Sequence, residues 1–219
     1  MSSTKRYSRR LPAVLLLLLV LMPPTVGAQE RVPPDAVALL QKLGGGGYNL
    51  YFRHAETNWS QSDDVQKAGD WRSCDGRRMR QLSAEGRATS AGIGEAMRAL
   101  RLPVQRVLTS PYCRCVQTAQ LLQVGPVVKT SAVINMRAAG YFGGRETVAG
   151  TAREVLGTVP PPGTNTVIVA HGNVAIATFG FRPAEGEAVV LQPRGDGEFA
   201  VRGRLTPEAF ELLAARVSP

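Results

Sequence analysis

The chain contains two histidines among its 219 residues, and each comes directly after a predicted strand. His54 follows the apolar run at 48–52 and Arg53, and His171 follows the run at 166–170. Short apolar runs bounded by turn residues are typical of buried strands. Ligands of open α/β sheets bind outside the carboxyl ends of the strands. We therefore expect both imidazoles to face one crevice at the edge of a sheet.

A third apolar run, 104–109, leads into Ser110-Pro111. This predicts a helix start, because proline fits the first turn of a helix. The free N–H groups and the dipole at such a start favour an anion. Arg53 and Arg114 would add guanidinium groups whose fork matches the oxygens of a phosphate. A neutral imidazole can attack phosphorus, and nearby cations favour its uncharged form. These residue types together predict a crevice for phosphoryl chemistry.

The elements that must position these residues alternate between strands and helices, as in α/β proteins. The strands are nearly continuous apolar runs, which is typical of a parallel sheet buried on both faces. We predict an α/β fold, a three-layer sandwich with a mostly parallel central sheet flanked by helices. The predicted helices span 34–43, 83–101, 110–122, 144–157 and 206–216, and the predicted strands span 48–52, 104–109, 124–129, 166–170, 188–192 and 198–203.

The first 28 residues have the layout of a secretory signal peptide. Four Lys and Arg residues stand within the first ten positions, an apolar stretch follows at 12–22, and Val26-Gly27-Ala28 ends the segment. The apolar stretch is shorter than the roughly 20 residues that a transmembrane helix needs. We expect cleavage near Ala28, a single domain at 29–219, a periplasmic or secreted location, and no membrane span after cleavage.

Composition and charge exclude several classes of protein. Loss of the leader lowers the formal net charge from +9 to +5, because it carries four basic residues and no acidic ones. Basic runs interleaved with aromatics are absent, so we expect no nucleic-acid partner. Two histidines and three cysteines exclude a multi-histidine or paired CxxC metal site. We therefore expect no metal and no cofactor.

The polar segment 58–82 shows no helix or strand periodicity. In an exported protein, a disulfide can hold such a segment in place. Disulfides persist outside the cytoplasm, so Cys74 is expected to pair with Cys113 or Cys115 and to pin this segment. Trp59 and Trp71 bracket the segment and are either anchors in a minor core or the rim of a substrate site.

Four stretches between about 48 and 173 together resemble branch 1 of the histidine phosphatase superfamily, the phosphoglycerate-mutase-like proteins. The stretch at 53–57 (RHAET) resembles the RHG motif, with Ala55 in place of the common glycine. The stretch at 82–87 (LSAEGR) resembles the L-[ST]-x-x-G helix start. The stretch at 109–119 resembles the S-x-x-x-R-x-x-[QE]-T-A segment, and 167–173 (VIVAHGN) resembles the strand before the second histidine.

This resemblance implies a role for each matching residue. His54 would be the phosphorylated nucleophile, Arg53 and Arg114 would clamp the phosphate, and His171 would hydrogen-bond the phosphate and the transition state. Asn173 and Glu56 are further substrate-binding candidates.

The acid that would protonate the leaving alkoxide remains open. The E-R-x-x-G stretch of the mutases is missing, and Gly172 stands where the phytase-like branch has an aspartate. Glu187 is the first candidate, followed by Glu146 and then Glu56. A missing acid would imply a good leaving group or a phosphohistidine substrate.

The expected function is that of an exported, metal-independent phosphatase that hydrolyses phosphomonoesters through a phosphohistidine on His54. Its partner would be a small phosphorylated molecule, for which an envelope sugar phosphate is one candidate. The arginine-rich stretch 72–80 would suit a substrate with more than one phosphate. Two alternatives stay open: a phosphate-ligand binding protein of the same fold without turnover, and a phosphoglycerate-mutase-like mutase. The export signal and the missing E-R-x-x-G stretch argue against the mutase.

Overall fold

The computed structural model describes residues 34–217, so the predicted signal peptide lies outside the described residues. A single mixed sheet runs through this part of the chain in the order β3-β2-β4-β1-β5-β6. Strands β3, β2, β4 and β1 pair in parallel, and β5 and β6 extend the sheet as an antiparallel hairpin. The strands are β1 (Asn49–Arg53), β2 (Val104–Thr109), β3 (Val127–Lys129), β4 (Asn165–Ala170), β5 (Ala188–Gly195) and β6 (Glu198–Leu205).

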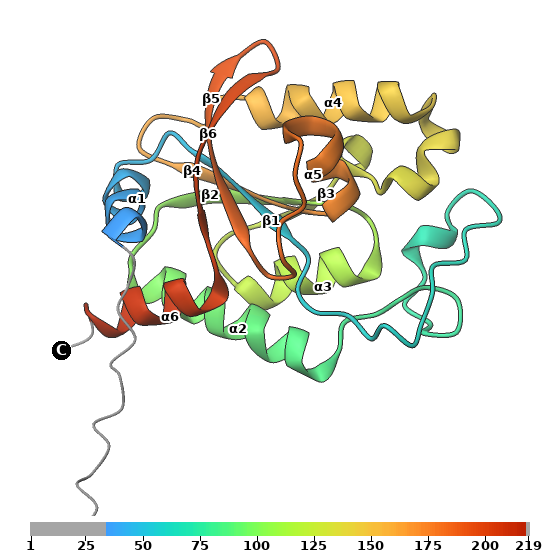
Figure 1. Ribbon diagram of the computed structural model, residues 1–219, viewed down its shortest axis with the longest axis horizontal. Coiled ribbons are helices and arrows are strands. Elements are labelled where there is room, and N and C mark those ends of the chain that lie inside the picture. Colours follow the sequence, from blue (N-terminus) through green and yellow to red (C-terminus); the bar gives the residue numbers. More distant parts are fainter. Residues whose placement is uncertain (1–33, 218–219) are drawn as a thin grey trace, which may run out of the picture. The chain divides into compact units, whose positions relative to one another are not determined.

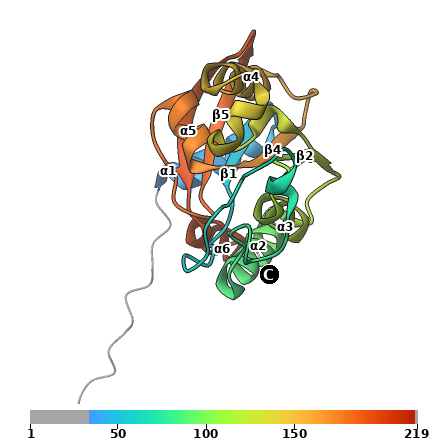
Figure 2. The same cartoon turned by 90° about the vertical axis from the view of Figure 1, so that its right-hand side faces the viewer.

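Helices cover both faces of the sheet. Helices α2, α3 and α6 lie on one face, and α4 and α5 lie on the other (Figures 1 and 2). This confirms the predicted α/β layers and the mostly parallel sheet. The helices are α1 (Pro34–Gly44), α2 (Ala84–Ala99), α3 (Cys113–Leu122), α4 (Arg145–Gly157), α5 (Gly172–Phe179) and α6 (Pro207–Ala215). No helix within residues 34–217 is long and apolar enough to cross a membrane.

The predicted elements agree with the structure except at their ends and in one helix. Helix α3 begins at Cys113, after an extended Tyr112, and not at Ser110. Helix α5 was not predicted, because it has only eight residues and no side-chain cap marks its start. Short 3₁₀ helices, among them Asp70–Arg72 and Met136–Phe142, lie in connections that the sequence pattern leaves irregular.

The register of the three central strands places their carboxyl ends side by side. Arg53 at the end of β1 pairs with Ala170 at the end of β4, and Thr109 at the end of β2 pairs with Val169. The next backbone N–H groups continue this pattern, because His54 N bonds to Ala170 O and Ser110 N bonds to Val169 O, both at 3.0 Å. The residues that follow the three strands therefore meet at one edge of the sheet.

The start of α2 packs directly against the chain that follows β1. Ser83 caps the helix by accepting a hydrogen bond from Gly86 N at 2.9 Å, and its Oγ donates to Glu56 Oε1 at 2.8 Å. A Cβ on Gly86 would meet Glu56 O at 2.1 Å, so only glycine allows this close approach. The LSAEG stretch thus fixes the loop that carries His54.

Candidate active site

A cavity of about 150 Å³ lies at the carboxyl edge of the sheet, where β1 and β4 end. Five arginines and one carboxylate line it, together with both histidines. A larger cavity of about 700 Å³ lies beside the disulfide, but its lining contains no histidine and no carboxylate. The smaller cavity therefore holds the groups that could do chemistry. Its lining consists of Arg53, His54, Trp59, Asp63, Arg80, Arg114, Asn135, Arg137, His171, Gly172, Asn173 and Arg182.

The two imidazole rings face each other across 5.5 Å between their centroids, at an angle of 68°. His54 Nδ1 lies 3.0 Å from Ala55 O. Because a carbonyl oxygen only accepts, Nδ1 carries the hydrogen and Nε2 keeps its lone pair. His171 Nε2 shares a hydrogen bond of 2.8 Å with Ser110 Oγ. Among the described residues, His54 Nε2 has no hydrogen-bond partner, so its lone pair is unoccupied.

Both histidines are electrically neutral in this site. Burial lowers the pKa of His54 well below its ordinary range, and the Arg114 guanidinium lowers it further. The same two causes, in the same order, lower the pKa of His171. Desolvation and neighbouring cations both disfavour the imidazolium form.

The side chains of Arg53 and Arg114 are held in different ways. Arg53 donates from Nη1 to Pro183 O at 3.1 Å and from Nη2 to Glu185 Oε1 at 3.0 Å. Arg114, which is 1% exposed, forms a bidentate ion pair with Asp63 at 2.8 and 2.9 Å. Its Nε is buried without a hydrogen-bond partner among the described residues. The fork that was predicted to hold phosphate therefore holds a carboxylate.

Asp63 is the carboxylate of the site that the sequence reasoning missed. It lies in the irregular segment 58–82, its side chain is 4% exposed, and Oδ1 also accepts the backbone N–H of Arg80 at 3.1 Å. No motif marks it, because its partner Arg114 is 51 residues away in sequence. Only its place in a polar segment between two motif stretches could have pointed to it.

The three glutamates that were candidates for the acid do not line this cavity. Glu187 is buried and forms an ion pair with Arg204 across the β5–β6 hairpin, while its Oε2 accepts Ala184 N at 2.7 Å. Glu146 is exposed in the first turn of α4. Glu56 is exposed and bonds to Ser83. Asp63 is the carboxylate that the structure places in the lining instead.

Asn173 does line the cavity and belongs to a small network. Its Nδ2 donates to Asn135 Oδ1 at 2.8 Å, and the same oxygen caps the following 3₁₀ helix by accepting Arg137 N at 2.9 Å. Gly172 leaves room for Arg182, because a Cβ there would meet Arg182 Cγ at 2.8 Å. Arg137 and Arg182 thus line the cavity beside the predicted Arg53 and Arg114.

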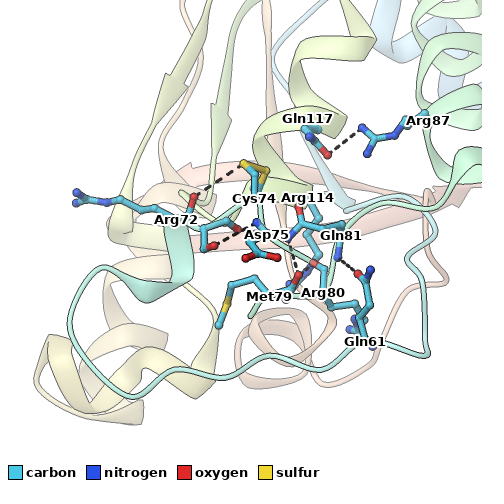
Figure 3. The surroundings of a disulfide bond; sticks show 12 residues. Gln61, Arg72, Cys74, Asp75, Met79, Arg80, Gln81, Arg87, Arg114 and Gln117 are labelled. Atoms are coloured by element: carbon cyan, nitrogen blue, oxygen red, sulfur yellow. Dashed lines mark hydrogen bonds between the residues drawn. A yellow bond between two sulfur atoms is a disulfide. The ribbon is translucent and has the colours of Figure 1, made fainter. Parts of the chain in front are cut away.

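The disulfide joins Cys74 to Cys113 and so settles the pairing that the sequence left open. Cys113 directly precedes Arg114, and Figure 3 shows Arg114 and Arg80 close to the bridge. Arg80 O accepts a bond of 3.1 Å from Arg114 Nη1. The bridge therefore pins segment 58–82 to the start of α3. Cys115 is free and buried, and burial raises the pKa of its thiol to about 12.

The two tryptophans divide between the two roles considered for them. Trp71 is 5% exposed and packs against Tyr141 and Phe142, so it is a core anchor. Trp59 is 63% exposed at the cavity, and Arg80 Cζ lies 3.9 Å from its ring centroid. Within residues 34–217, no group of three or more His, Cys, Asp or Glu residues could hold a metal ion.

Comparison with known proteins identifies a matching family and solved structures of similar fold. The profile of the histidine phosphatase superfamily, branch 1, matches residues 50–158. A mycobacterial glucosyl-3-phosphoglycerate phosphatase complexed with VO₃ is 15% identical, covering 71% of this chain and 97% of its own, with a TM-score of 0.50. A putative phosphohistidine phosphatase from Agrobacterium tumefaciens is 18% identical, covering 74% and 99%, with a TM-score of 0.48. No curated protein sequence matches the chain.

The family match spans the stretch that carries Arg53, His54 and Arg114. The mixed sheet and its helical layers have the fold of the solved phosphatase from mycobacteria. This chain belongs to the histidine phosphatase superfamily.

Proposed function

We propose that this protein is a metal-independent phosphatase that hydrolyses phosphomonoesters through a phosphohistidine on His54. One observation carries the proposal: a single cavity holds a neutral His54 with its Nε2 free, a neutral His171 and the guanidinium groups of Arg53 and Arg114. A phosphoryl transfer site needs a nucleophile and cations for the non-bridging oxygens, and this cavity supplies both.

In the first half-reaction, the lone pair of His54 Nε2 attacks phosphorus and the bond between phosphorus and the ester oxygen breaks. The phosphoryl oxygens bind to the guanidinium hydrogens of Arg53 and Arg114. Each terminal nitrogen of Arg53 carries two hydrogens, so its bonds to Pro183 and Glu185 leave others for the phosphate. In the second half-reaction, water attacks the phosphohistidine, and His54 leaves again as the neutral base.

We assign Asp63 as the acid for the leaving oxygen. In the resting site its carboxylate occupies the fork of Arg114, which a phosphate would also bind. Once phosphate takes that fork, Asp63 has lost its cation and lies beside a dianion. The displaced carboxylate takes one proton from solvent, and the resulting carboxyl group can donate it to the ester oxygen. The proton then passes from Asp63 to the leaving alkoxide, and Asp63 is restored as a carboxylate that can accept a proton from the attacking water.

The test is phosphate release from p-nitrophenyl phosphate by the purified mature protein in the presence of EDTA. His54→Ala should abolish turnover and acid-labile phosphate labelling of the protein. Arg145→Gln, at an exposed position outside the cavity, is the matched control and should keep both. A folded protein that releases no phosphate from a broad panel of phosphomonoesters contradicts the proposal.

One observation favours a second candidate, a phosphate-ligand binding protein without turnover. The carboxylate in the cavity is already bound by Arg114, and none of the glutamates expected as acid lies there. Tight binding of inorganic phosphate without formation of a phosphoenzyme would favour this candidate over the phosphatase.

We also propose that the protein acts outside the cytoplasm. The leader-like residues 1–28 and the Cys74–Cys113 disulfide support this location. Amino-terminal sequencing of protein recovered from the periplasm or the medium should give Gln29 as the first residue. Recovery of the full chain from the cytoplasm contradicts it.

A further inference from the structure

The cavity contains more positive charge than one phosphate group requires. Among its five arginines, Arg53 forms an ion pair with Glu185 and Arg114 forms one with Asp63. Arg80, Arg137 and Arg182 form no ion pair with any residue in the described part of the chain. Three guanidinium groups thus line the cavity without an ion pair of their own, although the charges of Asp63 and Glu185 act on Arg80 from a longer distance.

The guanidinium group of Arg80 is held in place but has spare donors. It stacks on Trp59 at 3.9 Å, and its Nε is buried without a partner among the described residues. Burial lowers the pKa of Arg80, and the charge of Arg114 lowers it further. An anion beside Arg80 would relieve both effects, because it would satisfy the free donor and offset the neighbouring charge.

Arg137 and Arg182 reach the same cavity from two different connections. Arg137 stands in the first turn of the 3₁₀ helix Met136–Phe142, whose cap Asn135 is bonded to Asn173. Arg182 follows α5 and lies against Gly172. Both side chains are exposed, so they border the cavity where it opens to solvent. Together with Arg80 they surround the place where the rest of a substrate would extend.

An uncharged alcohol portion would gain little from these three guanidinium groups, whereas an anionic portion would gain charge-assisted hydrogen bonds from them. The whole cavity is about 150 Å³, so a second anion must lie only a few bonds from the phosphate that reacts. We propose that Arg80, Arg137 and Arg182 form a second anion subsite, and that the preferred substrate carries a phosphate or carboxylate near the phosphate that is hydrolysed. The inference rests on the proposed phosphatase function.

The kinetic test compares three esters whose leaving groups are all primary alkoxides: propyl phosphate, its analogue with a terminal carboxylate, and its analogue with a terminal second phosphate. We expect kcat/KM to be higher for the doubly anionic substrates, and the two analogues distinguish carboxylate from phosphate as the second group. Arg137→Gln and Arg182→Gln should each lower kcat/KM for the preferred analogue by about tenfold more than for propyl phosphate. Arg145→Gln should leave all three values unchanged.

A binding test separates this inference from the proposed function. In the His54→Ala background, calorimetry should show that pyrophosphate binds about tenfold more tightly than inorganic phosphate. Adding Arg137→Gln should remove most of that difference. If phosphate binds but pyrophosphate binds no more tightly, and both analogues react no faster than propyl phosphate, the second subsite is refuted while the phosphatase stands. If neither anion binds and no substrate reacts, the proposed function itself fails.

Discussion

The exchange of Asp63 for phosphate at Arg114 predicts that one substitution changes binding and turnover in opposite directions. Asp63→Asn keeps the shape of the side chain but removes its charge and its transferable proton. In the wild type, phosphate must displace a carboxylate that makes two charge-assisted hydrogen bonds of 2.8 and 2.9 Å in a buried setting. A hydrogen bond to a charged group contributes about 1.5–3 kcal/mol. Without this competitor, inorganic phosphate should bind about 10–100 times more tightly.

Turnover should fall in the same variant. Loss of a general acid lowers the rate by about 10²–10⁴-fold when the leaving group is a poor one. We therefore expect such a loss of kcat for propyl phosphate, but less than about tenfold for p-nitrophenyl phosphate, whose phenolate leaves without a proton. Asp64→Asn is the matched control, because Asp64 is the exposed neighbour and lies outside the cavity lining.

Calorimetry with inorganic phosphate and steady-state kinetics on the two esters provide the readouts. Asp63→Asn also leaves the Arg114 guanidinium buried without its counter-ion, which destabilises the free protein by about 3–5 kcal/mol. Added phosphate should therefore raise its Tm by more than it raises that of the wild type. Phosphate binding that is unchanged or weaker refutes the exchange at Arg114. An equal fall in kcat on both esters refutes the role of Asp63 as acid.

Three further predictions follow from the site and its supports. Because the pKa values of His54 and His171 are depressed in the folded state, the free energy of unfolding should fall as pH drops below about 6.5, by up to about 1.4 kcal/mol per pH unit for each histidine. Urea unfolding between pH 7 and pH 5 measures this, and a pH-independent value contradicts the neutral pair. Cys74→Ser removes the bridge that closes a loop with a sequence separation of 39 residues, and it should lower the free energy of unfolding by about 4 kcal/mol. Urea titration again measures this value. A loss below about 1 kcal/mol would show that the bridge does not hold segment 58–82. Glu187→Gln should lower the free energy of unfolding by about 1–2 kcal/mol, because it weakens the bonds to Arg204. It should leave the ratio of kcat on propyl phosphate to kcat on p-nitrophenyl phosphate unchanged. A changed ratio would restore Glu187 as the acid.

The pairing of the cysteines illustrates what local sequence cannot decide. Cys113 and Cys115 are almost equally far from Cys74 in sequence, so both pairings were open. Two residues along a helix correspond to a rotation of about 200°, which places the two thiols on opposite sides of α3. Cys113 faces segment 58–82, and Cys115 is buried with its Sγ 3.5 Å from His171 Nε2. The orientation of α3 against the sheet therefore determined which of the two cysteines pairs with Cys74.

The sequence by itself determined the sheet and the residues at its carboxyl edge. A buried strand needs a continuous apolar run, and a residue directly after such a run can only lie at the strand's end, so His54 and His171 were placed by their neighbours in the chain. Arg114 could be predicted in the same way, since it follows the third run within a few residues.

Only the tertiary structure decided which other charges share the cavity. Asp63, Arg137 and Arg182 come from connections with no periodic pattern, and all three line the cavity that also holds the two histidines. Glu187 has a stronger sequence position, at the start of a strand, yet the β5–β6 hairpin places Arg204 beside it. The physical reason is that backbone periodicity sets what lies along a strand, whereas the charge of a cavity depends on which separate loops fold against it.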